Sequence, residues 1–345
     1  MDANKQKYLS IVILFILAFL VIIFSPFWGS KTFSLSDISP SQIHSRDFQI
    51  FWQMRIPRSL VAFFAGAIFA LCGMVFQAVF RNPLVCPFTL GVSAGASFGA
   101  SLYIWMGFSF AVLGISGITV FSFLGAFLAM MIVWSLSQIH LGTSTAKMLL
   151  AGVIVSFFFV SLIMLVQSLS GVYESFRITR WLMGSLALFG YGPLLEIMPF
   201  ALVTFFVIGY FTRELNLLAM GDEIAVSRGV NLKRLIKVLF LFLSIIIGRV
   251  VSICGPIAFI GIIAPHICRL LVGPDHKFLA PASLLFGGLF LTLCDMFART
   301  IAPPVEIPVG VITAIIGGPF FLWLLYSEAP RTNILGFRGA ESRAE

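Results

Sequence analysis

Long uncharged apolar stretches, separated by short charged segments, dominate the pattern of this sequence. Between Asn82 and Ala146, sixty-five residues pass without an Asp, Glu, Lys or Arg. A charged residue at the centre of a lipid-spanning helix costs roughly 2.5 to 3.5 kcal/mol on insertion scales, so such stretches are typical of membrane spans. A span needs about 20 apolar residues, and fewer where neighbouring helices shield it. Charges, prolines and glycines divide the chain into about ten predicted spans: 8–28, 57–80, 88–107, 110–138, 147–171, 193–213, 235–255, 257–272, 279–300 and 307–326.

The composition supports this interpretation. Hydrophobic residues make up 59% of the chain and charged residues 10%, whereas ordinary globular domains are roughly one quarter charged. The first apolar stretch follows Lys5 and Lys7 as a secretory signal would, but its length of about 20 residues and its lack of a small-residue cleavage pattern indicate a retained span. The sequence therefore predicts an all-α, polytopic membrane protein with a single transmembrane domain over residues 1–345.

Basic residues are unevenly distributed between the two sides of the predicted bundle. The net charge is +8, but the 22 basic residues are dispersed over short loops without interleaved aromatic residues, which argues against nucleic-acid binding. An even number of spans places both termini on one side. With that side inside, fourteen Lys and Arg residues are cytoplasmic and seven are external, as the positive-inside rule requires. We therefore expect both termini, including the tail 327–345, in the cytoplasm.

Two predicted loops are longer than a tight helix connection requires. The outer loop, residues 29–53, contains the turn-forming sequence Ser39-Pro40-Ser41. The inner loop, residues 214–234, carries apolar residues among charged ones, with Gly221 and Gly229 on either side. This pattern predicts a short helix along the membrane face, with the glycines supplying its turns. A merely solvated loop is the alternative.

Cysteine, proline and glycine positions predict packing and turns rather than chemistry. The five cysteines lie in or beside apolar segments, and no pair has metal-ligand spacing, so we expect buried thiols and no metal site. Pro83 and Pro265 are expected to break helices where the chain turns or lines a cavity. Gly91, Gly95 and Gly99 recur every four residues, which predicts one helix face that a neighbouring backbone approaches closely.

Several short strings carry more information than the general membrane pattern. Arg55-Ile56-Pro57-Arg58 opens the second predicted span, and Arg81-Asn82-Pro83-Leu84 follows its end. Others are Leu90-Gly91-Val92-Ser93-Ala94-Gly95-Ala96, Leu215-Asn216-Leu217-Leu218, Gly255-Pro256-Ile257-Ala258-Phe259-Ile260-Gly261 and Glu306-Ile307-Pro308-Val309-Gly310. In this order and spacing the strings closely resemble the FecCD-type permeases of ATP-binding-cassette (ABC) importers for iron chelates, haem and cobalamin, over roughly residues 50 to 326. The resemblance implies the fold of a type II importer permease.

The resemblance also assigns a role on the external face. In such permeases an arginine cluster receives carboxylates of a substrate-binding protein, and Arg55, Arg58 and Arg299 match it here. Arginine suits this task because its planar fork pairs a carboxylate through two hydrogen bonds and keeps its charge. The alternative is that these are ordinary arginines at helix ends, which extend toward the lipid headgroups.

On the cytoplasmic face the resemblance implies coupling helices and a gate. The coupling helices seat in the partner ATPases, and the gate closes the pathway near the cytoplasm. The matching coupling residues are Asn216, Leu217, Leu218, Gly221, Asp222, Glu223, Ala225, Arg228 and Gly229. The matching gate residues are Asn82 and Leu84 on one loop, and Thr145 and Ala146, with Ser144 as an alternative, on another.

Arg249 lies about two-thirds of the way across the seventh predicted span. A buried arginine in a membrane normally has a partner or a task. One hypothesis is that Arg249 faces the pathway and attracts an anionic chelate or a haem propionate. The other is a structural ion pair, for which Asp295 is the candidate partner.

The expected function is that of a permease subunit in a bacterial cytoplasmic membrane, paired with a second permease, most simply a copy of itself. A periplasmic or lipid-anchored binding protein delivers a ferric siderophore or haem, with cobalamin as the alternative cargo. No Walker lysine motif occurs, so two separate ATPase subunits are expected to hold ATP and magnesium, and this chain no cofactor. An ion-coupled secondary transporter is the competing class, but it generally needs ionisable groups at mid-membrane.

Overall fold

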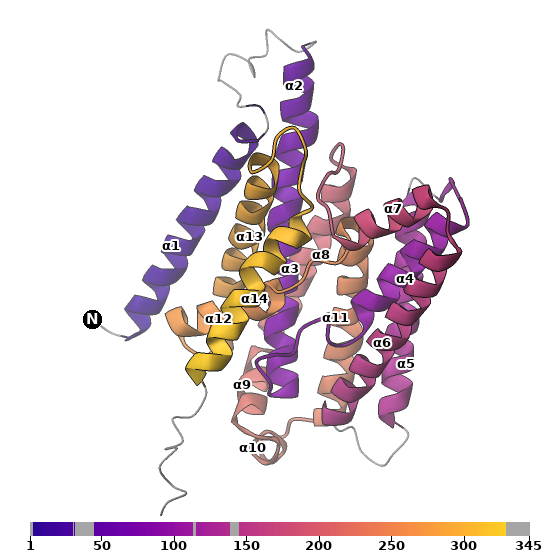
Figure 1. The fold of residues 1–345 in the computed structure, drawn as a ribbon. Helices are drawn as coiled ribbons and strands as arrows, with labels where there is room; N and C mark the ends of the chain where they lie inside the picture. The colour runs from indigo at the N-terminus through magenta and orange to yellow at the C-terminus, as the bar shows by residue number, and fades with distance from the viewer. Residues whose placement is uncertain (1–2, 30, 32–44, 113–114, 139–144, 329–345) are drawn as a thin grey trace, which may run out of the picture.

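The computed structural model describes residues 3–29, 31, 45–112, 115–138 and 145–328. Within them the chain is almost entirely helical (Figure 1). The longer helices are α1 (Ala3–Phe24), α3 (Ile56–Phe80), α4 (Val92–Trp105), α5 (Gly117–Gln138), α6 (Thr145–Leu169), α8 (Gly192–Tyr210), α11 (Leu232–Cys254), α12 (Ile260–Val272), α13 (His276–Thr300) and α14 (Val309–Glu328). The shorter elements are α2 (Arg46–Ile50), α7 (Val172–Leu182), α9 (Thr212–Met220), α10 (Asp222–Ser227) and an antiparallel pair of strands, β1 (Ala111–Val112) and β2 (Ile115–Ser116).

One of the longer helices overlaps each of the ten predicted spans, so the prediction of an all-α polytopic protein is confirmed. Seven helices among the described residues are long and apolar enough to cross a membrane. The apolar helices α4 and α12 are shorter, and so is the apolar segment Val309–Leu324 within α14. Helix α4 has 14 residues, fewer than a full span needs. It packs along α5, and a neighbouring helix of this kind can shield a short span from lipid.

Two predicted boundaries are wrong. The outer loop was expected to reach residue 53, but a helix already begins at Arg46 and continues through a π-helical stretch, Phe51–Arg55, into α3. The hydroxyl of Ser45 accepts a hydrogen bond from the Phe48 amide at 3.1 Å and so caps this helix. The predicted turn at 39–41 lies outside the described residues. The fourth span was expected from residue 110, but 111–112 and 115–116 form the two paired strands, and α5 begins at Gly117.

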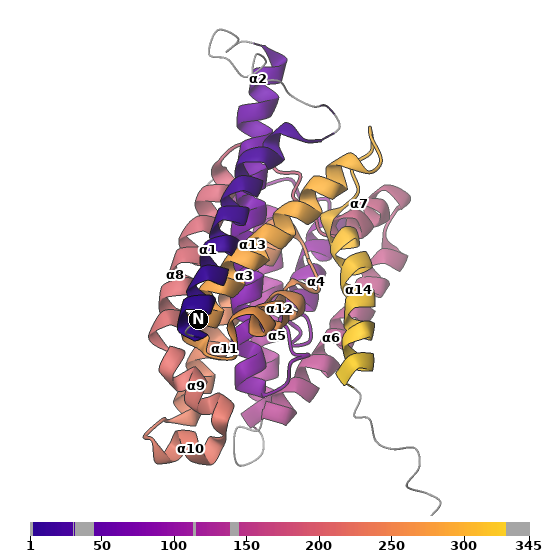
Figure 2. The same cartoon turned by 90° about the vertical axis from the view of Figure 1, so that its left-hand side faces the viewer.

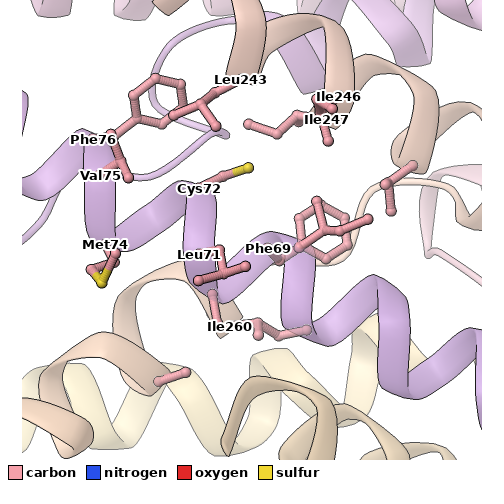
Figure 3. Packing of buried hydrophobic residues seen from close by; sticks show 14 of the residues in the cluster. Phe69, Leu71, Cys72, Met74, Val75, Phe76, Leu243, Ile246, Ile247 and Ile260 are labelled. Carbon is pink, nitrogen blue, oxygen red and sulfur yellow. The ribbon is translucent and has the colours of Figure 1, made fainter. Parts of the chain in front are cut away.

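Helix α3 lies at the centre of the bundle, with α1 and α13 on one side and α4, α5 and α6 on the other (Figure 1). Nearly all of its residues are buried, as expected for a helix that is apolar all round. Phe76 and Cys72 face Leu243 and Ile247 of α11 (Figure 3). All five cysteines are buried thiols, as predicted.

Glycines allow the closest helix contacts. A Cβ atom on Gly95 would lie 2.3 Å from the carbonyl oxygen of Gly125 in α5, and one on Gly99 would lie 2.0 Å from that of Phe121. No side chain fits such distances, so the predicted close approach is confirmed for Gly95 and Gly99. Gly91 does not share their helix face, because it precedes α4 with φ of 82° and faces the Gly152 carbonyl oxygen of α6.

The expectation for the two prolines is half right. Pro83 lies in the turn after α3, but Pro265 lies inside α12 and does not break it. Proline has no N–H, so the Gly261 carbonyl four residues earlier loses its helical partner. The side-chain amide of Gln77 in α3 replaces it, with Nε2 donating to that carbonyl at 3.0 Å. The Oε1 atom of Gln77 in turn accepts from Arg269.

The bundle has two distinct ends. Helix α2 lies at one end and α9 with α10 at the other, and α1 begins and α14 ends toward α10 (Figure 1). Figure 2 shows α1 beside α13, and their contact includes the rings of Tyr8 and Phe278, whose centroids are 5.2 Å apart. We call the end of the bundle at α2 the Arg58 end, and the end at α9 and α10 the α10 end.

Candidate functional site

The Arg58 end brings Arg55, Arg58 and Arg299 together around a hollow of about 650 Å³. All three side chains are buried, Arg299 to 3% exposure. Nη1 of Arg55 donates to the carbonyl oxygen of Pro26 at 3.1 Å. The arginines expected to receive a partner thus form one compact cluster, although they are not freely exposed.

Two carboxylates, which sequence reasoning did not assign to this cluster, neutralise part of its charge. Asp295 is fully buried, and its oxygens lie 2.8 Å from Nη2 of Arg58 and 3.1 Å from Nε of Arg299. Glu306, on the connection between α13 and α14, lies 2.6 Å from Nη1 of Arg58. The signal for Glu306 was its place in the string 306–310, and for Asp295 its spacing of four residues before Arg299.

Arg249 has a different partner from the one considered. Asp295 belongs to the Arg58 end, whereas Arg249 forms an ion pair with Glu196 of α8. The Arg249 side chain is 15% exposed and that of Glu196 is 33% exposed. Two other hollows in the structure, one between α4 and α6 and one beside α14, are not lined by Arg249. Sequence reasoning missed Glu196, whose signal is a lone acidic residue near the start of the predicted span 193–213.

At the α10 end, the predicted inner loop contains two short helices. Helix α10 is the predicted one, and α9 lies between it and α8. Gly221, with φ of 135°, separates α9 from α10, and Gly229, with φ of 84°, follows α10. Leu218 and Ala225 point into the protein, whereas the other positions assigned to coupling are half-buried or exposed. The exposed side chains on this surface are both charged and apolar: Met220, Asp222, Glu223, Ile224, Val226 and Arg228.

Arg81 connects this surface to α3. It ends α3 in the left-handed conformation, with φ of 47°. Its Nε donates to the carbonyl oxygen of Leu218 in α9 at 3.1 Å, and its Nη2 pairs with Asp222 of α10. The next residue is Asn82, whose Oδ1 accepts from the Leu84 amide at 2.9 Å. A single arginine therefore joins both short helices to the loop that carries two predicted gate residues.

Asn216 ties α9 to the start of α13. Its Nδ2 donates to Oδ1 of Asp275 at 2.8 Å, and its Oδ1 accepts from the His276 amide at 2.9 Å. Burial alone would raise the pKa of Asp275, but hydrogen bonds from the Lys277 amide and from Asn216 lower that pKa below its ordinary value. The α9 segment is thus attached to two long helices, α3 and α13, through polar contacts.

The other gate residues begin α6, where Thr145 is half-buried and Ala146 is exposed. Ser144 lies outside the described residues. No hydrogen bond joins Thr145 or Ala146 to the Asn82 loop among the residues that the structure describes.

One hollow lies between α4 and α6, and a second lies beside α14. The first, of about 370 Å³, includes the hydroxyls of Ser93, Ser97 and Ser156. The second, of about 480 Å³, runs along the start of α14. Both include Phe88. Their lining is mostly apolar, with a few hydroxyl groups.

The comparisons with known proteins decide which class of protein carries this arrangement. The model of the FecCD transport family matches residues 14–327. The chain belongs to this family. It is 33% identical over 329 residues to the hemin transport system permease protein HmuU of Yersinia pestis, which covers 95% of this chain and 98% of that protein. It is 38% identical over 288 residues to the cobalamin import system permease protein BtuC of Halobacterium salinarum, covering 81% of this chain and 73% of that protein.

A solved structure described as an inward-facing conformation of a metal-chelate type ABC transporter has the same fold. Its TM-score is 0.82 at 32% identity, and the match covers 92% of this chain and 98% of that one. A further relative, the molybdate import system permease protein MolB of Haemophilus influenzae, is 37% identical over 281 residues, which is 81% of each chain.

These matches establish what kind of protein the chain is. It is a multi-pass membrane protein and the permease subunit of an ABC importer, which makes it a transport protein and not an enzyme. Such permeases carry no bound cofactor and work with ATPase and binding-protein partners. The relatives are named for hemin, cobalamin and molybdate, so family membership does not select the cargo.

Proposed function

We propose that two copies of this chain form the conduit of a bacterial importer that moves a ferric siderophore or haem into the cytoplasm by alternating access. Cobalamin is the second candidate cargo. The observation that supports this most is the separation of two different surfaces at opposite ends of one bundle. The Arg58 cluster, which consists of Arg55, Arg58 and Arg299 with Asp295 and Glu306, is suited to acidic side chains of a binding protein. At the other end, the mixed apolar and charged surface of α10 is suited to an ATPase.

In this proposal the α10 end faces the cytoplasm. The excess of Lys and Arg on the loops of that side supports the orientation. The coupling residues between Asn216 and Gly229 contact the ATPase, whose ATP-driven closure moves them as a rigid unit. Arg81 then passes this movement to the Asn82 loop, because it binds both short helices and directly precedes that loop.

The outward faces of α6 and α14 are proposed to meet the second copy. They carry large exposed apolar side chains, such as Phe157 at 70% and Leu322 at 67% exposure. An exposed apolar face of this kind marks an interaction surface or a lipid contact. The hollows beside it, with apolar walls and hydroxyls from Ser93, Ser97 and Ser156, suit a bulky chelate that must pass without being held tightly.

The competing function, an ion-coupled secondary transporter, finds little support in the helices described. Asp295 in α13 and Glu196 in α8 are both held by arginines. A carboxylate that is paired in this way is a poor site for a driving ion, because the arginine already neutralises it.

Reconstitution tests the proposal. The permease in nanodiscs with its ATPase should hydrolyse ATP faster when a binding protein loaded with ferric siderophore, haem or cobalamin is added, and the stimulating cargo identifies the substrate. The permease alone should drive no uptake. Uptake by the permease alone under a proton or sodium gradient would instead establish the competing function.

A further inference from the structure

The two carboxylates of the Arg58 cluster differ in burial and in their contacts with the arginines. Asp295 is fully buried beneath the arginines and contacts both Arg58 and Arg299. The side chain of Glu306 is 38% exposed and pairs with Nη1 of Arg58 at 2.6 Å. A carboxylate from outside the molecule can therefore reach the position of Glu306 but not that of Asp295.

The hollow also contains an unfilled donor. Arg46, Arg55, Arg58 and Arg299 line it, with Glu306 as an acidic side chain beside them. Nη1 of Arg299 is buried without a hydrogen-bond partner among the described residues. Buried donors normally find an acceptor. The hollow thus offers positive charge and unfilled donor capacity to an acidic group.

Glu306 is close in sequence to α14, which lines one of the two hollows. Val309 begins α14 three residues later. The Ile307 amide donates to the carbonyl oxygen of Ala298 in α13 at 3.1 Å. At Gly310 a Cβ atom would lie 2.1 Å from the Met183 carbonyl oxygen, so the first turn of α14 packs closely against the chain after α7. The connection that carries Glu306 thus continues directly into the closely packed first turn of α14.

We propose that Glu306 is an internal stand-in for a carboxylate of the binding protein. It occupies Arg58 while the permease is undocked, and an acidic side chain of the docked binding protein displaces it. Its release frees the connection before α14 and so reports docking to the helix that lines the conduit. This inference rests on the proposed function, because it concerns the regulation of the docking surface. Asp295 stays in place throughout and holds the two arginines in position.

The test is the affinity of the permease–ATPase complex in nanodiscs for the substrate-binding protein that stimulates its ATP hydrolysis in the reconstitution above, measured by biolayer interferometry. Glu306→Gln removes the competing charge, so binding should tighten by at least about tenfold, the low end of coupling between close charge pairs at interfaces. Glu306→Asp keeps the charge on a shorter side chain and should give an intermediate affinity. Asp47→Asn is the control, because it removes an exposed carboxylate that pairs with Lys31 outside the cluster.

Each result has a defined meaning. Tighter binding for Glu306→Gln, with basal ATP hydrolysis raised toward the docked level, supports the stand-in role. Wild-type affinity or weaker binding for folded Glu306→Gln overturns it and leaves the proposed function intact. If the wild-type complex does not bind the binding protein at all, while binding ATP normally, the docking function itself fails and the inference with it.

Discussion

Replacing Asp295 by asparagine should destabilise the protein strongly, although Asp295 is a single residue at one end of the bundle. Its side chain is fully buried and binds both Arg58 and Arg299. Asparagine keeps the shape but removes the charge, which leaves two buried guanidinium groups and, among the described residues that line the hollow, Glu306 as their acidic neighbour. Breaking a buried ion pair by removing one partner costs about 3–5 kcal/mol, because the remaining charge stays desolvated.

The matched control is Asp47→Asn. Asp47 pairs with Lys31, and their side chains are 35% and 59% exposed, so the loss should be about 0–1 kcal/mol. Arg299→Gln should fall between the two, since Asp295 keeps its contacts with Arg58. Unfolding in detergent micelles, followed by helical circular dichroism as denaturant increases, gives the three free energies. If Asp295→Asn costs no more than Asp47→Asn, the cluster is not a buried charge network and the reasoning is refuted.

Three further predictions concern other parts of the bundle. Arg81→Ala should reduce uptake with little effect on stability or basal ATP hydrolysis. Its pair with Asp222 is largely exposed and is worth about 1 kcal/mol at most. Uptake at the wild-type level would exclude Arg81 as the residue that passes movement from α9 and α10 to the Asn82 loop. Arg249→Ala should lower stability by about 1–3 kcal/mol, between the values for surface and buried pairs, with uptake per folded molecule unchanged, whereas a transport defect in a stable protein would support a pathway role. Gly95→Ala should cost about 1–3 kcal/mol in unfolding free energy because of overpacking against α5, and Gly209→Ala, where a Cβ meets nothing within 4 Å, should cost nothing.

Hydropathy, together with the charges, prolines and glycines that separate the spans, predicted most of the fold because each span obeys a local rule. A helix in lipid must be apolar and must satisfy its own backbone, and both requirements can be read from about 20 consecutive residues. The inner helix α10 was predictable for the same reason, since Gly221 and Gly229 supply the turns that bracket it. The extra helical turns before Arg55 and the short helix α7 were missed, because their mixed polarity resembles that of a loop.

Features that depend on distant partners were not predictable. Pro265 was expected to break a helix, and only the amide of Gln77, 184 residues away from Gly261 in sequence, explains why α12 continues through it. The partners of Arg58 are 237 and 248 residues away, and the motif that identified the arginine contains no information about its burial. Glu196 likewise pairs with Arg249 across 53 residues.

The most direct test of the central claim is site-specific photo-crosslinking from α10 in the assembled transporter. A photoreactive residue at Ile224 or Val226, both exposed apolar positions, should crosslink to the ATPase subunit, with a yield that changes when ATP binds. The same probe at Gln49, which lines the hollow at the Arg58 end, should crosslink to the binding protein and not to the ATPase. Crosslinking of the ATPase at Gln49, or its absence at both α10 positions in an active complex, would contradict the account.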